Sequence, residues 1–420
     1  MSIHDVSSSG RFGAVLDRLS GELGVDRSRQ LWLAAAPGRT ELAGNHTDHN
    51  HGRVLAASVD LESIAAVSPR PDRIARVASE GYPLIEIDLS DTEIRPQERG
   101  TTAALLRGVA AGFARDGCRP GGFDAAVSST VLSGSGLSSS ASIEVLFGII
   151  VDALFNDGAA GSMRIAQIGR FAENSYFGKP CGLMDQLACA TGGVIAIDFA
   201  DPDSPTLERL DVTFDEHGLA LLVVDSGASH ADLTDEYAAI PRDMRAIATA
   251  LDEQVLADVA PARFYGDLAR LRRQTGDRAV SRAIHFYDEN ARVAQMVAAL
   301  REHRFNEYLA LMADSGRSSG IYLQNCAPTT NPNEQGVVIA LALTEHYLNA
   351  SGLRNGAEAA CRVHGGGFAG TIQVLLPLEH EDRYTDFICG HLGEHAVTRL
   401  SIRTTGATCV RAAEQGRTNH

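Results

Sequence analysis

The chain has 420 residues, 44% of them hydrophobic, which is enough for two or three domains with buried cores. A formal net charge of −16 argues against nucleic acid or an anionic membrane as a partner, although it does not exclude ATP, which arrives with Mg²⁺. Seven scattered cysteines without a CxxC pair, an N-terminus without a signal-peptide pattern and the absence of a long apolar run predict a cytoplasmic protein without a membrane span.

The hydrophobic pattern predicts strands and helices mixed along the chain. Two strands, at 31–37 and 53–67, flank a polar loop. Further helices are expected at about 102–115, 138–155, 162–176, 232–254, 280–302, 304–316 and 334–350, and further strands at 122–132, 192–199, 219–226, within 360–377 and near 405–411. Because strands and helices do not alternate strictly, we expect an α+β fold of mixed sheets and helical layers. The turn-rich segment 201–205 is the predicted domain boundary.

A loop rich in glycine and serine lies between the predicted strand at 122–132 and the long apolar helix that follows. Glycines let a backbone approach a ligand closely, and the free N–H groups at a helix start favour an anion. No charged side chain lies between Asp124 and Glu144, so backbone dipoles and hydroxyls would hold a phosphate here. The alternative is a flexible turn with a serine N-cap. The predicted phosphate-binding residues are Gly134, Ser135, Gly136, Leu137, Ser138, Ser139, Ser140 and Ala141.

Residues 36–52 concentrate polar side chains between two apolar strands. The cluster His46, Asp48, His49 and His51 matches the ligand types of a metal site. The same density of donors and acceptors suits a polyhydroxylated ligand, since every buried hydroxyl needs a partner, and a solvated polar loop is the remaining alternative. Arg39, directly after Pro37 and Gly38, offers a permanent positive charge to an oxyanion or a phosphoryl group.

Lys179 is the only lysine of the chain. A mechanism that needs a lysine on the phosphates therefore has a single candidate, and it lies in neither a Walker A loop nor a protein-kinase strand motif. A phosphate held by the serine loop would therefore be bound without a lysine from either motif.

Four segments resemble the signatures of galactokinases. Residues 35–59 (AAPGRTELAGNHTDHNHGRVLAASV) resemble the family's APGR-x-NLIGEHTDYN segment, and residues 133–142 (SGSGLSSSAS) resemble its phosphate loop. Residues 180–187 (PCGLMDQL) are similar to PCGIMDQ, and residues 364–370 (HGGGFAG) are similar to TGGGFGG. The segments stand in the family's order over nearly the whole chain. The sequence is thus identified as a member of the superfamily of galactokinase, homoserine kinase, mevalonate kinase and phosphomevalonate kinase.

The resemblance implies a two-domain kinase that transfers a phosphoryl group from ATP to the anomeric hydroxyl of galactose, giving galactose 1-phosphate. The implied domains are 1–200 and 201–420, with the active site in the cleft between them, and the extreme C-terminus can return to the first domain. ATP and a small sugar are the implied partners, and the protein is expected as a monomer or a weak homodimer.

The resemblance also implies roles for single residues. Asp185 corresponds to the base that accepts the proton of the sugar hydroxyl, and Arg39 lies opposite it. Ser140 and Glu173 correspond to the ligands of Mg²⁺, the implied cofactor. The implied sugar contacts are Asn45, His46, Asp48, Gly182 and Tyr237.

Three positions depart from the family pattern: Asn45 replaces a glutamate, Glu41 an asparagine and His49 a tyrosine. An amide at position 45 is expected to relax recognition of the sugar's C6 hydroxyl, unless Glu41 takes over. A kinase for galacturonate, N-acetylgalactosamine or arabinose is therefore one alternative function. An inactive sugar sensor is another, but the serine loop and Asp185 are intact.

Overall fold

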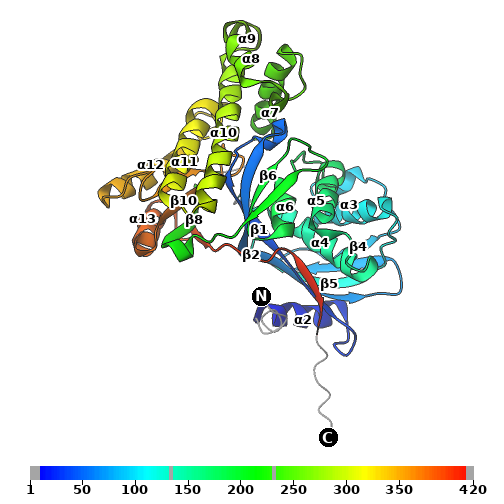
Figure 1. The fold of residues 1–420 in the computed structure, drawn as a ribbon. Helices are drawn as coiled ribbons and strands as arrows, with labels where there is room; N and C mark the ends of the chain where they lie inside the picture. Colours follow the sequence, from blue (N-terminus) through cyan, green and yellow to red (C-terminus); the bar gives the residue numbers. More distant parts are fainter. Residues whose placement is uncertain (1–9, 132–135, 229–232, 413–420) are drawn as a thin grey trace.

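The computed structural model describes residues 10–131, 136–228 and 233–412, and the predicted residues Gly134 and Ser135 lie outside these ranges (Figure 1). Two sheets and the helices packed on them make up the described chain. None of the described helices is long and apolar enough to cross a membrane.

The first sheet has eight strands, of which β12, β1, β2, β5, β3 and β4 follow one another in that order, while β6 pairs with β2 and β7 with β6. Its long central strands β1 and β2 are antiparallel, and the pair β3–β5 is parallel. The bounds are β1 Trp32–Ala43, β2 Arg53–Pro69, β3 Ile74–Ser79, β4 Ile85–Asp88, β5 Phe123–Ser129, β6 Val194–Asp198, β7 Thr206–Leu210 and β12 Thr408–Arg411.

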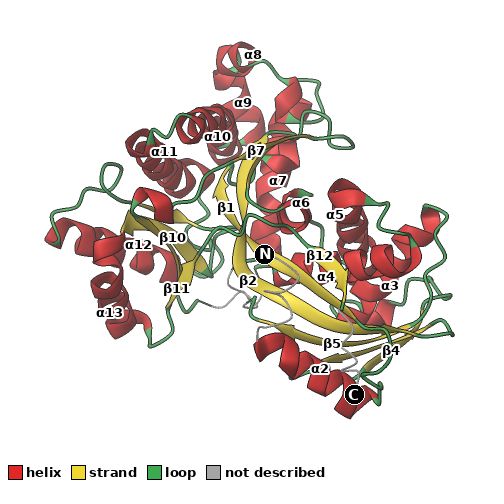
Figure 2. Cartoon of the chain, turned by 60° about the horizontal axis from the view of Figure 1, so that its bottom comes forward, coloured by secondary structure: helices red, strands yellow, loops and turns green. Residues whose placement is uncertain are grey.

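Helices cover both faces of the first sheet (Figure 2). Alternate residues of a strand point to opposite faces, so Leu33 and Ala35 pack against α2 (Gly10–Leu23), while Ala34 and Ala36 point to the other face. That other face carries the helices α3 Thr102–Arg115, α4 Ser139–Phe155, α5 Gly161–Phe171 and α6 Met184–Thr191. Helices α4 and α6 bring the phosphate-loop serines and Asp185 to the same side of the sheet.

The second sheet has the strand order β11 (Val397–Leu400), β8 (Leu219–Asp225), β10 (Thr371–Pro377) and β9 (Ala360–Val363). Leu221 and Val223 face α10 (Asp277–Arg301) and α11 (Phe305–Ser318). Leu222 and Val224 face α12 (Gly336–Ala350) and α13 (Glu381–Leu392). The core on the α10 side also contains side chains of β1 and β2, which joins the two sheets.

A further helical group stands beyond the end of β1. It consists of α7 (Thr234–Ala250), α8 (Pro261–Gly266) and α9 (Leu268–Thr275), which pack with the first half of α10 around their own apolar core (Figure 1). Helix α7 carries Tyr237, and this packing brings it to the glycine-rich segment 364–370.

The expected α+β fold of mixed sheets and helical layers is confirmed, and three details of the sequence prediction are wrong. First, β1 does not stop at residue 37 but continues to Ala43, because its pairing with β2 resumes after register shifts at Pro37/Arg39 and Glu41/Ala43. Second, the helix expected at 162–176 changes to a π-helix at Ala172–Phe177. Third, strands β3, β4, β7 and β11 and helices α2, α6, α8 and α9 were not expected.

The division into domains at residue 200 stays a prediction. Residues 201–205 form the turn between β6 and β7, two strands of the first sheet. The chain enters the second sheet at β8 and returns to the first sheet with β12, which pairs with β1.

Candidate active site

Arg39 and Asp185 form the centre of the site. Arg39 lies on β1, and Asp185 lies in the first turn of α6. The guanidinium donates two hydrogen bonds to the carboxylate, Nε to Oδ1 and Nη2 to Oδ2, both at 2.8 Å. This bidentate geometry holds both planar groups in one orientation and fixes the position of the Asp185 carboxylate.

The electrostatics of this pair keep both groups charged. Burial raises the pKa of Asp185, but the charge and hydrogen bonds of Arg39, with a hydrogen bond from the Ser138 hydroxyl, outweigh it and leave the pKa below its ordinary value. Burial in turn lowers the pKa of Arg39, and the Asp185 carboxylate reverses this effect and raises it. Asp185 is therefore an ionised acceptor at neutral pH.

The described part of the phosphate loop, residues 136–141, is joined to Arg39. The Arg39 side chain donates to the carbonyl of Gly136, and its backbone N–H donates to the carbonyl of Leu137 at 3.1 Å. Gly136 has φ +71°, which favours glycine, and a Cβ there would lie 2.9 Å from Nδ1 of His364. Helix α4 starts directly after Ser138, whose hydroxyl donates to Asp185. The free backbone N–H groups of the first turn of α4 therefore lie near Asp185.

The two predicted metal ligands lie together. The hydroxyl of Ser140 is 2.8 Å from Oε1 of Glu173, whose side chain is 1% exposed. Lys179 places its ammonium 3.3 Å from the same oxygen. The second oxygen, Oε2, accepts a hydrogen bond from Gln186 at 2.8 Å. Glu173 is thus a buried carboxylate whose orientation is fixed by Ser140 and Gln186 and whose charge is paired with the Lys179 ammonium.

The polar residues predicted to contact a sugar differ in their neighbours and in how deeply they are buried. Asp48 stands against Gly182, where a Cβ would overlap its carboxylate. His46 points Nε2 at the carbonyl of Gly366, 3.0 Å away, and burial together with the charge of His49 lowers its pKa to about 3. Asn45 is completely buried, with its amide bonded within the protein. Its contact with the sugar stays a prediction.

Tyr237, the last predicted sugar contact, packs on the glycine-rich segment. Its hydroxyl donates to the carbonyl of Gly367 at 3.0 Å, and its ring lies edge-on to Phe368. A Cβ on Gly366 would lie 2.5 Å from Cε1 of the Tyr237 ring, so the contact requires glycine.

Sequence reasoning missed several buried polar residues around the site. Arg362 is fully buried and pairs with Glu41, and Asn325 donates to Asn45 and Gly366. His364 bridges Thr371 and Thr40 at 3.0 Å each. His364 is the first residue of the HGGGFAG segment that the sequence analysis identified, but Arg362 and Asn325 belong to no motif that it recognised. Among the described residues, no three His, Cys, Asp or Glu side chains gather in a metal-binding arrangement.

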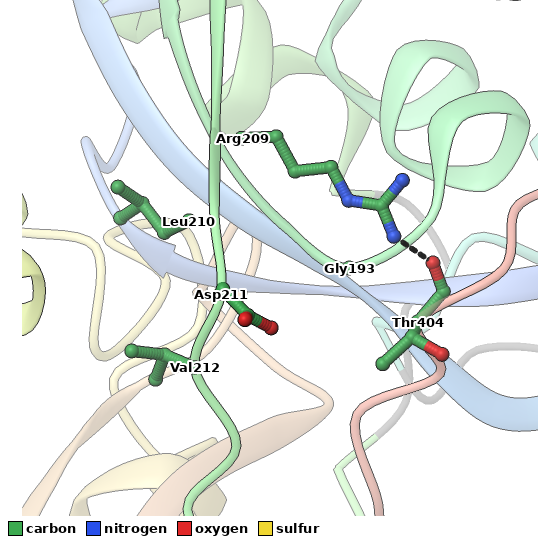
Figure 3. Close-up of a pocket in the computed structure, with 6 residues that line it drawn as sticks. All are labelled: Gly193, Arg209, Leu210, Asp211, Val212 and Thr404. Carbon is green, nitrogen blue, oxygen red and sulfur yellow. Dashed lines mark hydrogen bonds between the residues drawn. The ribbon is translucent and has the colours of Figure 1, made fainter.

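A cavity of about 310 Å³ lies elsewhere, between the β6–β7 hairpin and the segment that returns to β12 (Figure 3). Arg209 crosses it and donates to the carbonyl of Thr404. Its lining residues are Gly193, Arg209, Leu210, Asp211, Val212 and Thr404. No predicted site residue belongs to this set, so the cavity is separate from the Arg39–Asp185 centre.

Two family models match the segments that carry Arg39 and Asp185. Residues 24–69 match the galactokinase galactose-binding signature, which covers β1 and the polar segment after it. Residues 104–193 match the N-terminal domain of GHMP kinases, which covers α3 to α6 with the phosphate loop and Asp185. Fold and site together define a small-molecule kinase of this superfamily.

Similar proteins support a narrower family. The chain is 31% identical to galactokinase of Streptomyces coelicolor over 382 residues, 88% of this chain and 92% of that protein. In fold it is similar to Lactococcus lactis galactokinase complexed with galactose, with a TM-score of 0.79 at 22% identity over 95% of this chain and 99% of that one. Mevalonate kinase of Methanococcus jannaschii has a TM-score of 0.59 at 14% identity, over 89% and 98%. The chain belongs to the galactokinase family.

Proposed function

We propose that the protein transfers the γ-phosphoryl group of Mg-ATP to the anomeric hydroxyl of galactose, giving galactose 1-phosphate and ADP. The observation that carries this proposal is the bidentate Arg39–Asp185 pair beside the phosphate loop. It combines an ionised carboxylate, a fixed positive charge and the start of a helix at one point. These are the parts that phosphoryl transfer needs from a protein.

In this proposal Asp185 accepts the proton of the anomeric hydroxyl. The hydroxyl oxygen forms a bond to the γ-phosphorus of ATP, and the bond between the γ-phosphorus and the ADP oxygen breaks. A carboxylate with a lowered pKa is a weak base, so its contribution lies mainly in orienting the hydroxyl. Arg39 stabilises the transferring group and keeps Asp185 ionised. The hydroxyl of Ser138, which donates to Asp185, fixes the carboxylate from the side of the phosphate loop.

The oxygens of Ser140 and Glu173 fit Mg²⁺, and we propose them as its protein ligands. Mg²⁺ prefers hard oxygens and takes one or two protein ligands together with nucleotide phosphates. The Lys179 ammonium beside Glu173 supports this proposal, because it shows that the buried carboxylate attracts a cation. When bound, Mg²⁺ would neutralise the phosphates of ATP, and Gln186 would hold the second oxygen of Glu173 in place.

His46, Asp48, Gly182 and Tyr237 are proposed to line the sugar side, with the cleft between the two sheets as the substrate site. Asp48 supports this, because its half-buried carboxylate can accept hydroxyl donors and lies against Gly182, three residues before Asp185. The short connection between Gly182 and the proposed base keeps the sugar contact and the reacting oxygen close.

A panel of free sugars with ATP tests the function directly. Galactose should be consumed, and ³¹P NMR should show a phosphate on the anomeric oxygen. Galacturonate, N-acetylgalactosamine, arabinose and 6-deoxygalactose complete the panel. No ATP consumption with galactose above the sugar-free blank, together with turnover of another sugar, would contradict the proposal.

A further inference from the structure

Side chains of other segments hold the glycine-rich segment 364–367 in place by donating hydrogen bonds to its backbone carbonyls. Three consecutive carbonyls, those of Gly365, Gly366 and Gly367, each accept a hydrogen bond from a side chain of a distant segment. In the order of the carbonyls, the donors are Asn45, His46 together with Asn325, and Tyr237. Three of these four donors, Asn45, His46 and Tyr237, were also predicted to contact the sugar.

Asn45 uses both ends of its amide for this purpose. Its Nδ2 donates to the carbonyl of Gly365 at 2.5 Å and to Oε1 of Glu41 at 3.0 Å. Its Oδ1 accepts from Nδ2 of Asn325 at 2.7 Å and from the hydroxyl of Ser319 at 3.4 Å. An amide has two donor hydrogens and two acceptor positions, so all four are occupied within the protein. Asn45 is also 0% exposed and has no surface for a ligand.

Glu41 accounts for an amide at position 45, because Oε1 of its buried side chain accepts a hydrogen bond from Nδ2 of Asn45. Glu41 is buried and its carboxylate pairs with Arg362, which is itself fully buried. A carboxylate at position 45 would lie about 3 Å from that of Glu41 and would offer no hydrogen to the carbonyl of Gly365. The two departures at positions 41 and 45 therefore match each other. Compared with the family pattern, the carboxylate stands at position 41 on β1 and the amide at position 45. The Asn45 amide donates to both Glu41 and Gly365.

The glycine segment in turn touches the phosphate loop. A Cβ on Gly365 would lie 3.8 Å from Cα of Gly136, and a Cβ on Gly136 would lie 2.9 Å from the ring of His364. Gly136 also accepts the hydrogen bond from Arg39. A shift of Gly365 would therefore reach the phosphate loop and the residue that orients Asp185.

We propose that Asn45 is a positioning residue for the nucleotide side of the site and not a sugar contact. It fixes Gly365 through its amide, Gly365 packs on Gly136, and Gly136 carries the loop that meets the phosphates. The step from Gly136 to the nucleotide rests on the proposed function. The hydrogen bonds from Asn45 to Gly365 and Glu41 do not.

The test is calorimetric titration of Asn45→Asp with a non-hydrolysable ATP analogue plus Mg²⁺, and separately with galactose. Aspartate keeps the shape but removes both donor hydrogens and adds a charge beside Glu41. The expected result is a loss of nucleotide affinity of about tenfold or more, with galactose affinity within about threefold of wild type. The kcat/KM ratio of galactose to 6-deoxygalactose should stay unchanged. The matched control is Asn50→Asp, another fully buried asparagine of the same segment, which bonds to Met244 and Leu256 and not to the glycine segment.

Two results would overturn the proposal. One is a fall in galactose affinity with unchanged nucleotide affinity, which makes Asn45 a sugar contact. The other is an equal loss of nucleotide affinity in Asn50→Asp, which makes the effect general destabilisation. If Asn45→Asp does not fold, Asn325→Ala, which removes donors to Asn45 and Gly366, carries the same expectations and the same two overturning results. A wild-type protein that binds the nucleotide but does not phosphorylate galactose contradicts only the proposed substrate, since the titrations need no turnover.

Discussion

Arg39 and Asp185 are joined by two parallel hydrogen bonds of 2.8 Å, although they are 146 residues apart in the sequence. The pair unites β1, which carries the sugar signature, with α6, which carries the PCGLMDQL segment. Since the same guanidinium also donates to Gly136, one side chain orients the proposed base and contacts the phosphate loop. Changes at Asp185 should therefore affect chemistry more than ground-state binding.

Asp185→Asn should abolish phosphoryl transfer and leave sugar binding nearly intact. The variant loses the proton acceptor and the charge that faces Arg39, so kcat should fall by about a thousandfold or more. Steady-state kinetics and galactose titration measure the two effects. As a graded control, Ser138→Ala removes one hydrogen bond to Asp185 and should cost only about tenfold. Turnover of Asp185→Asn above about a tenth of wild type would show that Asp185 is not the base.

Gly136→Val should block nucleotide binding. The new Cβ would lie 2.9 Å from Nδ1 of His364 and 3.1 Å from Oγ1 of Thr371, and the backbone has φ +71°. We expect ATP affinity to fall by about a hundredfold or more, as measured by titration. Gly158→Val is the matched control, because Gly158 has φ +70° but no atom within 4 Å of its Cβ position. Equal ATP affinity in both variants would contradict the role of Gly136.

Lys179→Met should keep activity within about tenfold of wild type. The lysine side chain is 62% exposed, and its ammonium contacts Glu173 rather than the phosphate loop. Kinetics at varied ATP concentration measure the effect. Glu173→Gln, which alters the proposed metal ligand, should instead raise the Mg²⁺ concentration needed for half-maximal rate. A Lys179→Met protein without measurable ATP affinity would assign phosphate binding to the lysine.

Glu144→Gln should make the protein more stable at alkaline pH. Burial and the charge of Glu173 raise the pKa of Glu144 well above its ordinary value, while Oε2 accepts a hydrogen bond from Gln186 at 2.9 Å. The folded protein thus keeps a proton that the unfolded chain has lost above about pH 4.5, so wild-type stability falls as the pH rises. Glutamine has the same shape and no proton to lose. Thermal unfolding should show similar melting temperatures at pH 5 and a variant that melts about 2–4 °C higher at pH 8.

Glu289→Gln is the control of opposite sign. Burial raises the pKa of Glu289, but the charges of His285, Arg292 and Arg362 outweigh it and lower the pKa to about 2. Its contribution to stability is present above the ordinary carboxylate pKa and is lost only as the pH falls toward 2. Glu289→Gln should therefore be less stable than wild type at both pH 5 and pH 8. Melting curves of Glu144→Gln that stay parallel to wild type across this range would show that Glu144 is ionised in the fold.

Sequence-based prediction used short runs of residues, and the strand and the helix expected on either side of the glycine and serine loop are confirmed. The strand, the glycine and serine loop and the apolar helix α4 follow one another directly, so local pattern alone indicated a phosphate site. The segment with Asp185 was found through its resemblance to a family motif. Prediction was wrong at the end of β1, because polar residues such as Arg39 and Glu41 indicate a loop until their partners on other segments are known.

The sequence therefore identified candidate functional residues, whose roles stay predictions, but their partners were decided by the tertiary structure. The resemblance to the family implied that Asn45 contacts a sugar, but a sequence motif does not show which groups surround the amide in this fold. Folding places Glu41, Asn325 and Gly365 around it, from segments up to 320 residues away, and these contacts occupy the amide completely. In the same way, the pKa of Asp185 depends on burial and on Arg39, which lies 146 positions away along the chain. Burial and charge proximity are distances in space, and a sequence specifies them only through the whole fold.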